Sequence, residues 1–295
     1  MGIRFGPSGN SESFYDKGYK HTYQAPEYLA EMGLDAFEYS FGRGVRMTEA
    51  TAKAIRTSME EYDIALSLHS PYYINLCVED EERKQKNKRY FTETAKAALM
   101  MGADRAVFHA GAVTKMSRER AMELALPLLK EILDELDTEG LGAIRFCPET
   151  MGKLNQFGNL DEMIRICAED DRLIPAVDFA HLHARENGAL TSTDAFAQVL
   201  DALEDGLGAE RAKNMHIHFS TIEFTKMGEK RHRTFAETEY GPRFEFLAPL
   251  LAGRGYTPRI ICESNGTMAE DAASMKASYI ASLNSLKQRV ALNGS

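Results

Sequence analysis

The sequence predicts an α/β fold of the (β/α)8 TIM-barrel type, on three observations. Short runs rich in β-branched and aromatic residues alternate with longer runs of helical periodicity, in eight successive units. Strict alternation indicates a parallel sheet with right-handed crossovers, and eight units predict closure into a barrel. Side chains that can bind metals end six of the short runs. Because 295 residues suit one such barrel, we expect a single domain over residues 1–295.

Each strand-like run is followed by a helical run. The expected strands are IRFGPSG (3–9), DAFEYS (35–40), IALSLH (64–69), RAVFH (105–109), AIRFCPE (143–149), LIPAVD (173–178), NMHIH (214–218) and RIICE (259–263). The helical runs span residues 26–32, 48–62, 80–101, 117–136, 160–168, 193–203, 244–251 and 269–290. Thr48 and Ser117 stand where helices 48–62 and 117–136 need an N-cap.

Composition excludes several classes of protein. The net charge of −9 argues against a broad basic surface for nucleic acid, although bound divalent ions would reverse the sign inside a carboxylate-rich cleft. The four cysteines lack CxxC spacing and lie in or beside hydrophobic runs, which favours packed, reduced thiols. No stretch has the length of a membrane span and no signal peptide is recognisable, so we expect a cytoplasmic protein.

Six candidate metal ligands lie at or near the ends of successive strand-like runs: His69, His109, Glu149, Asp178, His216 and Glu263. The carboxyl ends of barrel strands meet at one face, so these side chains are expected to converge there. A single histidine at such a place is most often structural. Three carboxylates and three imidazoles buried together without a cation are much less plausible, since unpaired buried charges are very unfavourable.

More ligand-type residues surround this set. His181 follows Asp178 by three residues, His218 shares a strand face with His216, and His232 lies in a polar segment. For His218 a ligand role and a structural role both stay open, and His21 and His183 are expected to be surface or packing residues. Imidazole and carboxylate ligands suit zinc, with manganese and ferrous iron as alternatives. The number of ligands predicts two or three ions, an arrangement that recurs in phosphodiester hydrolysis.

At these residues the chain resembles the endonuclease IV family of zinc-dependent apurinic/apyrimidinic endonucleases, within the xylose isomerase-like TIM barrels. The matching segments are HSPYYINL (69–76), VFHAG (107–111), ETMGK (149–153), QFG (156–158), VDFAH (177–181), MH (215–216) and ICES (261–264). An endonuclease IV-related branch is indicated by RGVRM (43–47), DFAHLHAR (178–185), HIHFS (216–220) and GEKRH (228–232). The resemblance covers most of the chain.

The resemblance implies hydrolysis of the DNA phosphodiester 5′ to an abasic sugar, in damaged double-stranded DNA, with zinc ions as cofactors. By motif, His69 and His109 would hold a first ion and Glu149 would bridge to a second. Asp178, His216 and Glu263 would complete the second site, and His181 and His232 would belong to the third. Glu149 and Glu263 are the expected catalytic carboxylates. Tyr72 would contact DNA at the lesion and Arg231 a phosphate, in a protein that we expect to be a monomer.

The third site departs from the family pattern. The family has Asp-Arg-His where this chain has Lys230, Arg231 and His232, so Glu229 or Glu223 must supply the carboxylate if a third ion is kept. Two other functions remain open. The first is a single-metal sugar isomerase or epimerase of the same superfamily, which needs only a Glu-Asp-His-Glu set of ligands. The second is a metal-dependent barrel that binds DNA or a partner protein without catalysing a reaction.

Overall fold

The barrel closes through two sheets in the computed structural model, which describes residues 2–113 and 115–293. Two four-stranded sheets have the strand orders β1-β12-β9-β8 and β2-β3-β4-β6, and all pairs within them are parallel. Parallel bridges join the sheets where Ser8 meets Glu38 and where Glu149 meets Ala176. The eight strands therefore form one closed ring, which confirms the predicted (β/α)8 barrel.

The strands lie where the hydrophobic runs predict them. Their bounds are β1 (Arg4–Pro7), β2 (Ala36–Ser40), β3 (Ala65–His69), β4 (Arg105–Phe108), β6 (Arg145–Pro148), β8 (Ala176–Asp178), β9 (His216–Phe219) and β12 (Arg259–Cys262). Most of their side chains are buried, because strands of a parallel barrel are covered on both faces.

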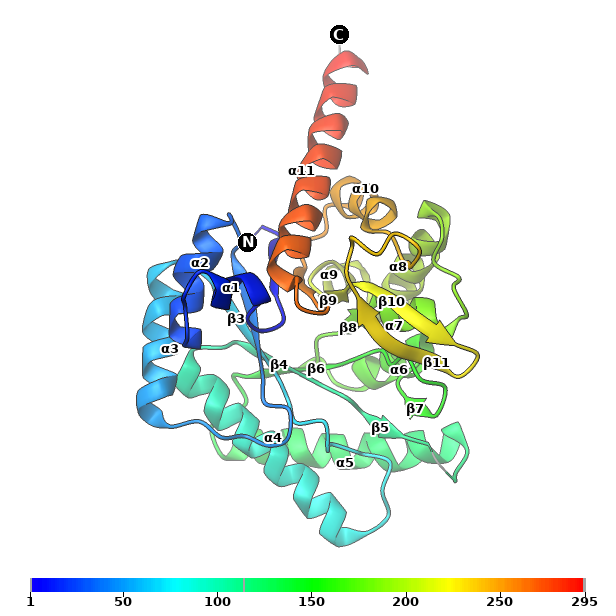
Figure 1. The fold of residues 1–295 in the computed structure, drawn as a ribbon. Coiled ribbons are helices and arrows are strands. Elements are labelled where there is room, and N and C mark those ends of the chain that lie inside the picture. The colour runs from blue at the N-terminus through cyan, green and yellow to red at the C-terminus, as the bar shows by residue number, and fades with distance from the viewer. Residues whose placement is uncertain (1, 114, 294–295) are drawn as a thin grey trace.

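Helices surround the strands (Figure 1). The eight predicted helices are α2 (Ala25–Glu31), α3 (Glu49–Glu61), α4 (Glu81–Met101), α5 (Arg118–Thr138), α6 (Leu160–Glu169), α8 (Thr193–Leu207), α10 (Phe244–Arg254) and α11 (Met268–Asn293). Thr48 and Ser117 cap α3 and α5 as predicted, each accepting a hydrogen bond from the backbone amide three residues on. The C-terminal part of α11 projects from the barrel (Figure 1). In the described ranges, no helix combines the length and apolarity needed to cross a membrane.

Several elements were not predicted. The short ones are α1 (Glu12–Asp16), the 3-10 turn η1 (Thr22–Gln24), β5 (Gly111–Ala112), β7 (Gln156–Phe157) and α9 (Ala209–Lys213). Two others position the site: α7 (Phe179–Arg185) begins directly after β8, and a hairpin of β10 (Thr221–Thr225) and β11 (Gly228–Arg233) follows β9. The hairpin was missed because its second strand is almost entirely polar, whereas hydrophobic runs were the signal used for strands.

Candidate metal centre

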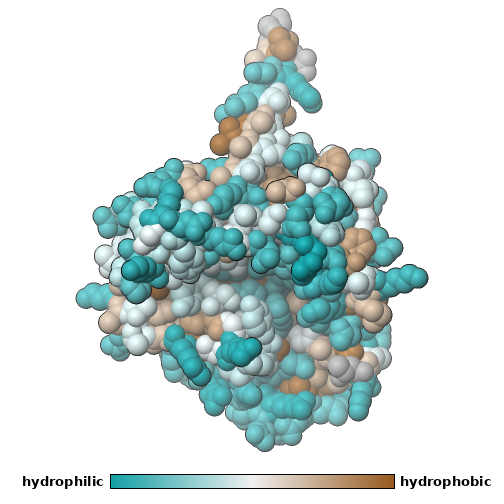
Figure 2. Space-filling model, in the orientation of Figure 1, coloured by the Kyte–Doolittle hydropathy of each residue, from teal (hydrophilic) through white to brown (hydrophobic). Residues whose placement is uncertain are grey.

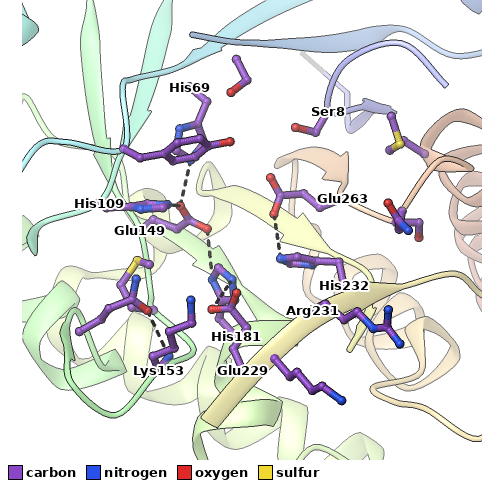
Figure 3. A pocket seen from close by; sticks show the side chains of 18 of the residues that line it. Ser8, His69, His109, Glu149, Lys153, His181, Glu229, Arg231, His232 and Glu263 are labelled. Carbon is purple, nitrogen blue, oxygen red and sulfur yellow. Dashed lines mark hydrogen bonds and ion pairs between the residues drawn. The ribbon is translucent and has the colours of Figure 1, made fainter. Parts of the chain in front are cut away.

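A cavity of about 820 Å³ opens at the carboxyl ends of the barrel strands. Ligand-type residues from several strand ends and from the hairpin line it, among them His69, His109, Glu149, His181, His232 and Glu263 (Figure 3). The molecular face in Figure 2 is mostly hydrophilic and is hollowed near its centre. Side chains that are distant in sequence therefore meet at the place where barrels of this type carry their active sites.

Glu149 is the centre of this arrangement. It follows β6, is only 1% exposed, and has histidine nitrogens around both carboxylate oxygens. His69 Nε2 and His109 Nε2 lie 3.2 and 3.1 Å from Oε2. His181 Nδ1 and His218 Nδ1 lie 3.3 and 3.2 Å from Oε1. One buried carboxylate thus connects four imidazoles, as a bridging ligand between neighbouring ions would.

Two of these histidines have a fixed orientation. The Nδ1 of His69 lies 2.9 Å from the carbonyl oxygen of Ser70, and the Nδ1 of His181 lies 2.9 Å from that of Thr150. A carbonyl oxygen only accepts, so Nδ1 is the donor in both rings, which leaves Nε2 as the nitrogen that could bind an ion. This is the usual arrangement of metal-binding histidines, in which one nitrogen is held by the protein and the other binds the ion.

Asp178 is positioned by two local interactions. Its backbone amide donates to Thr150 Oγ1 at 2.9 Å, and its Oδ1 caps α7 by accepting from the His181 amide at 2.7 Å. The cap starts α7 immediately after β8 and so brings His181 back over the barrel end. The second oxygen, Oδ2, is buried without a hydrogen-bond partner and lies 3.3 Å from His181 Nδ1. A buried carboxylate oxygen of this kind fits a metal ion.

Three overlapping groups have ligand atoms close enough to share an ion. The groups are His69 with His109 and Glu149; Glu149 with Asp178, His218 and Glu263; and Asp178 with His181 and His232. All donors are imidazole or carboxylate, and the four cysteines are free thiols outside these groups. The donor set therefore fits zinc and similar divalent ions.

The electrostatics show how strongly this site attracts positive charge. Burial by itself would raise the pKa of Glu149, but the charges of His218 and His109 hold the pKa of this carboxyl well below its usual range. Burial would lower the pKa of His69, yet the hydrogen bond and charge of Glu149 raise it to about 9. Bound divalent ions would supply the same compensating charge.

The structure corrects the prediction for His216. This residue was expected beside Asp178 and Glu263, but its Nε2 lies 3.1 Å from Glu38 instead. His218 takes the place beside Glu149 and Glu263, with its Nδ1 3.2 and 3.5 Å from their carboxylate oxygens. The register explains the exchange: His218 stands opposite Asp178 at the strand end, whereas His216 stands opposite Ala176, one layer deeper.

The sequence left open whether Glu229 or Glu223 supplies the carboxylate of the third site, and the β10–β11 hairpin places the two residues in different surroundings. Glu229 on β11 lines the cavity, and its Oε2 lies 3.4 Å from His181 Nε2. Glu223 on β10 instead pairs with three cations of β11, namely Lys230, Arg231 and Arg233. His232 joins the site from β11, with Nε2 3.7 Å from Glu263 and Nδ1 2.7 Å from the hydroxyl of Ser220. Glu229, not Glu223, is therefore placed to complete a site with His181 and His232.

The two expected substrate contacts lie at the rim of the same cavity. Tyr72 is 57% exposed, and its ring centroid lies 5.8 Å from those of both His69 and His109. Arg231 is also exposed, and Glu223 accepts a hydrogen bond of 3.0 Å from its Nε. Both side chains line the cavity, together with Lys153 and Lys230. An aromatic face and three cations thus surround the mouth of the site.

Glu38 was missed in the sequence. It lies in the middle of β2, is fully buried, and contacts the Nε2 atoms of both His216 and His218. The available signal was a glutamate inside the hydrophobic run DAFEYS, which a buried strand accepts only with a partner. The two histidines that were predicted to be surface or packing residues are found in such positions. His21 is exposed beside Tyr23, and the ring of His183 packs against Phe224.

Known proteins with similar sequences include an uncharacterized protein and several described as probable endonuclease 4. An uncharacterized protein of Methanocaldococcus jannaschii is 35% identical over 260 residues, which cover 88% of this chain and 91% of the relative. A protein of Acholeplasma laidlawii described as a probable endonuclease 4 is 27% identical, over 64% of this chain and 69% of its own length.

Solved structures share the fold at lower identity. Endonuclease IV from Thermus thermophilus has a TM-score of 0.67 at 20% identity, covering 96% of this chain and 99% of its own. A D-tagatose 3-epimerase-like protein has a TM-score of 0.70 at 16% identity, covering 98% of this chain and all of its own. The sequence model of the xylose isomerase-like TIM barrel family matches residues 26–288 of this chain. With its closed barrel and this match over most of its length, the chain belongs to the xylose isomerase-like TIM barrel family.

Proposed function

We propose that this protein is a metal-dependent, endonuclease IV-like phosphodiesterase that cleaves double-stranded DNA 5′ to abasic sites. The three overlapping ligand groups around Glu149 and Asp178 carry the proposal. A single-metal isomerase needs only Glu149, Asp178, His218 and Glu263, and has no use for the two outer groups. The cofactors would be two or three zinc ions, with manganese and ferrous iron as alternatives. The protein would be a cytoplasmic monomer with a single domain.

Each group would hold one ion. His69, His109 and Glu149 would hold the first; Glu149, Asp178, His218 and Glu263 the second; and Asp178, His181, His232 and Glu229 the third. Divalent ions at these places would supply an activated water molecule and positive charge for the phosphodiester.

The residues of the rim would bind the DNA. Lys153, Lys230 and Arg231 would contact phosphates, which the rest of a chain of charge −9 would otherwise repel. Tyr72 would stack at the lesion, where the missing base leaves a gap. Glu263, whose side chain is 17% exposed in the cavity, would accept the proton of the attacking water, while the more deeply buried Glu149 holds the ligands in place.

Incision of a labelled duplex with one abasic site tests the proposal. Zinc-loaded protein should cut 5′ to the lesion, leave the intact duplex uncut, and lose activity in EDTA. Replacement Glu263→Gln should slow the reaction by at least about 100-fold, since it removes a charged group at the reacting centre. Asp161→Asn, at an exposed position on α6, is the matched control and should cut like the wild type. Absence of incision by fully loaded wild-type protein contradicts the proposal.

A sugar isomerase or epimerase is the second candidate. It is favoured by the similarity to a D-tagatose 3-epimerase-like protein and by the four-ligand group that one ion would satisfy. Interconversion of a ketose and its epimer, with one ion per chain and no incision, would identify this function. Binding of abasic duplex without cleavage would indicate a binding barrel.

A further inference from the structure

A buried carboxylate lies directly behind the candidate metal centre. Glu38 is fully buried on β2, and no substrate in the cavity could reach it. Its Oε1 lies 2.9 Å from His218 Nε2, and its Oε2 lies 3.1 Å from His216 Nε2. Ser67 Oγ donates to Oε2 at 2.9 Å. Contacts on both oxygens therefore leave this carboxylate little freedom to rotate.

His218 is oriented differently from the other histidines of the site. His69 and His181 give Nδ1 to a backbone carbonyl and leave Nε2 for an ion. In His218 the roles are reversed, because Nδ1 faces Glu149 and Glu263 while Nε2 faces Glu38. Within the described chain, neither Nε2 of His218 nor Oε1 of Glu38 forms an aligned hydrogen bond, with each other or with another group, although the two atoms lie within ion-pair distance. Their mutual contact is thus the one polar interaction that can orient this ring from behind.

We infer that Glu38 is a positioning residue that keeps His218 protonated on Nε2, so that Nδ1 is presented to the ion shared by Glu149, Asp178 and Glu263. The inference rests on the metal centre of the proposed function. A carboxylate that accepts the second N–H of a metal-binding histidine fixes the tautomer and raises the basicity of the ligand nitrogen. Glu38 itself touches neither substrate nor ion in this role. His216 and Ser67 fix its other oxygen.

The Glu38 group could also be considered as a metal site of its own. It offers three ligand atoms, one each from Glu38, His216 and His218, and all three residues are completely buried. Zinc in proteins takes four ligands, and a closed core gives water no route to supply the fourth. The groups around Glu149, in contrast, each include residues that line an open cavity, such as His69, His232 and Glu263. The geometry therefore favours a supporting carboxylate over an additional ion.

The first experiment measures zinc binding by competition with a chromophoric chelator. Glu38→Gln keeps the shape but removes the charge, and should weaken binding of one ion by about 10- to 100-fold while the number of ions at saturating zinc stays unchanged. Asp161→Asn is the control, because it also removes a carboxylate charge but at an exposed position on α6 outside the ligand groups. Its zinc affinity should equal that of the wild type. Unchanged affinity in folded Glu38→Gln overturns the inference, and loss of a whole ion at saturation assigns the group as a metal site instead.

The second experiment needs no variant and so remains informative if Glu38→Gln fails to fold. Long-range 15N–1H spectra of zinc-loaded wild-type protein with labelled histidine report which nitrogen of each ring carries the proton. We expect His218 to be protonated on Nε2 and metal-bound through Nδ1, the reverse of His69 and His181. A His218 bound through Nε2 contradicts the inference. Neither experiment uses DNA, so failure of the inference and failure of the nuclease proposal are separately visible.

Discussion

Glu229 and Glu223 lie on the two strands of one hairpin, yet their surroundings differ. Glu229 faces His181 across 3.4 Å at the edge of the cavity. Glu223 is held by Lys230, Arg231 and Arg233, which lower its pKa to about 2 through their hydrogen bonds and charges. A carboxylate that is already neutralised by three cations has little left to offer a metal ion. At the scale of the residue, the partner rather than the residue type decides the role.

Replacing each glutamate separately tests this difference. Glu229→Gln should reduce the ions retained after dialysis by about one per chain, because the third group loses a ligand and a charge. Glu223→Gln should leave the ion count unchanged, since its carboxylate does not face the cavity ligands. Elemental analysis of both proteins, purified without chelator, gives the answer. Equal ion counts in Glu229→Gln and the wild type would show that Glu229 is not a ligand.

At the scale of the element, the start of α6 holds the loop that carries Lys153 and Gln156 to the cavity. Glu162 Oε2 accepts from the backbone amides of Gly158 and Asn159 at 2.8 and 2.9 Å, while Asn159 caps the helix in return. Arg118 donates to both oxygens of Glu162 and to the carbonyl of Gln156. Glu162 is buried and connects the capping box to Arg118, so the loop is fixed to the barrel and not free in solvent.

Removing the charge of Glu162 should destabilise the protein. We expect Glu162→Gln to lower the free energy of unfolding by about 2 kcal/mol at pH 7, because Arg118 loses its buried partner. Burial would raise the pKa of Glu162, but the hydrogen bonds of Arg118 and the backbone lower it below its ordinary value. The carboxylate therefore contributes fully above its unfolded pKa of about 4.3, and the contribution is lost as the pH falls through the lower folded pKa.

Urea unfolding of wild type and Glu162→Gln at pH 7 and near pH 3 measures this effect. The difference between the two proteins should shrink at the acidic pH. Asp161→Asn provides the control, because Asp161 is adjacent on α6 but 78% exposed, and its effect should stay within about 0.5 kcal/mol. A difference for Glu162→Gln that is independent of pH would contradict the assigned charge pairing.

At the scale of the whole molecule, the barrel depends on the close approach of β1 and β2. The strands meet near Gly6, where a Cβ atom would lie 1.7 Å from the carbonyl oxygen of Ala36. The seam continues with the amide of Gly9, which donates to the carbonyl oxygen of Glu38 at 2.9 Å. Only glycine fits this approach, and the same seam holds the strand that carries Glu38 behind the site.

Gly6→Ala should therefore open the seam. We expect a loss of at least about 3 kcal/mol in the free energy of unfolding, because the obstacle is backbone and cannot rotate away. Gly253→Ala is the matched control: this glycine lies in α10 with open space around its Cβ position, so alanine should stabilise by up to about 1 kcal/mol. Urea unfolding of both variants distinguishes the cases, and a Gly6→Ala protein as stable as the wild type would refute the tight seam.

The sequence by itself determined the alternation of elements and the face on which the site lies. Hydrophobic runs, N-caps such as Thr48 and Ser117, and ligand-type residues at strand ends are local signals, and each needs only a few neighbouring residues to be recognised. His69, His109, Glu149, Asp178 and Glu263 meet at the candidate metal centre for this reason. They end or follow barrel strands, and parallel strands end at one face.

Only the tertiary structure decided which atoms meet. Strand register placed His218 rather than His216 opposite Asp178, and a shift of two residues along a strand keeps the same face, so the sequence pattern could not distinguish them. Pairing within a polar hairpin assigned Glu229 to the cavity and Glu223 to its cations. The contact of Glu38 with His218 joins β2 to β9. Such contacts depend on barrel closure, which couples residues far apart in the chain and leaves no mark in their local sequence.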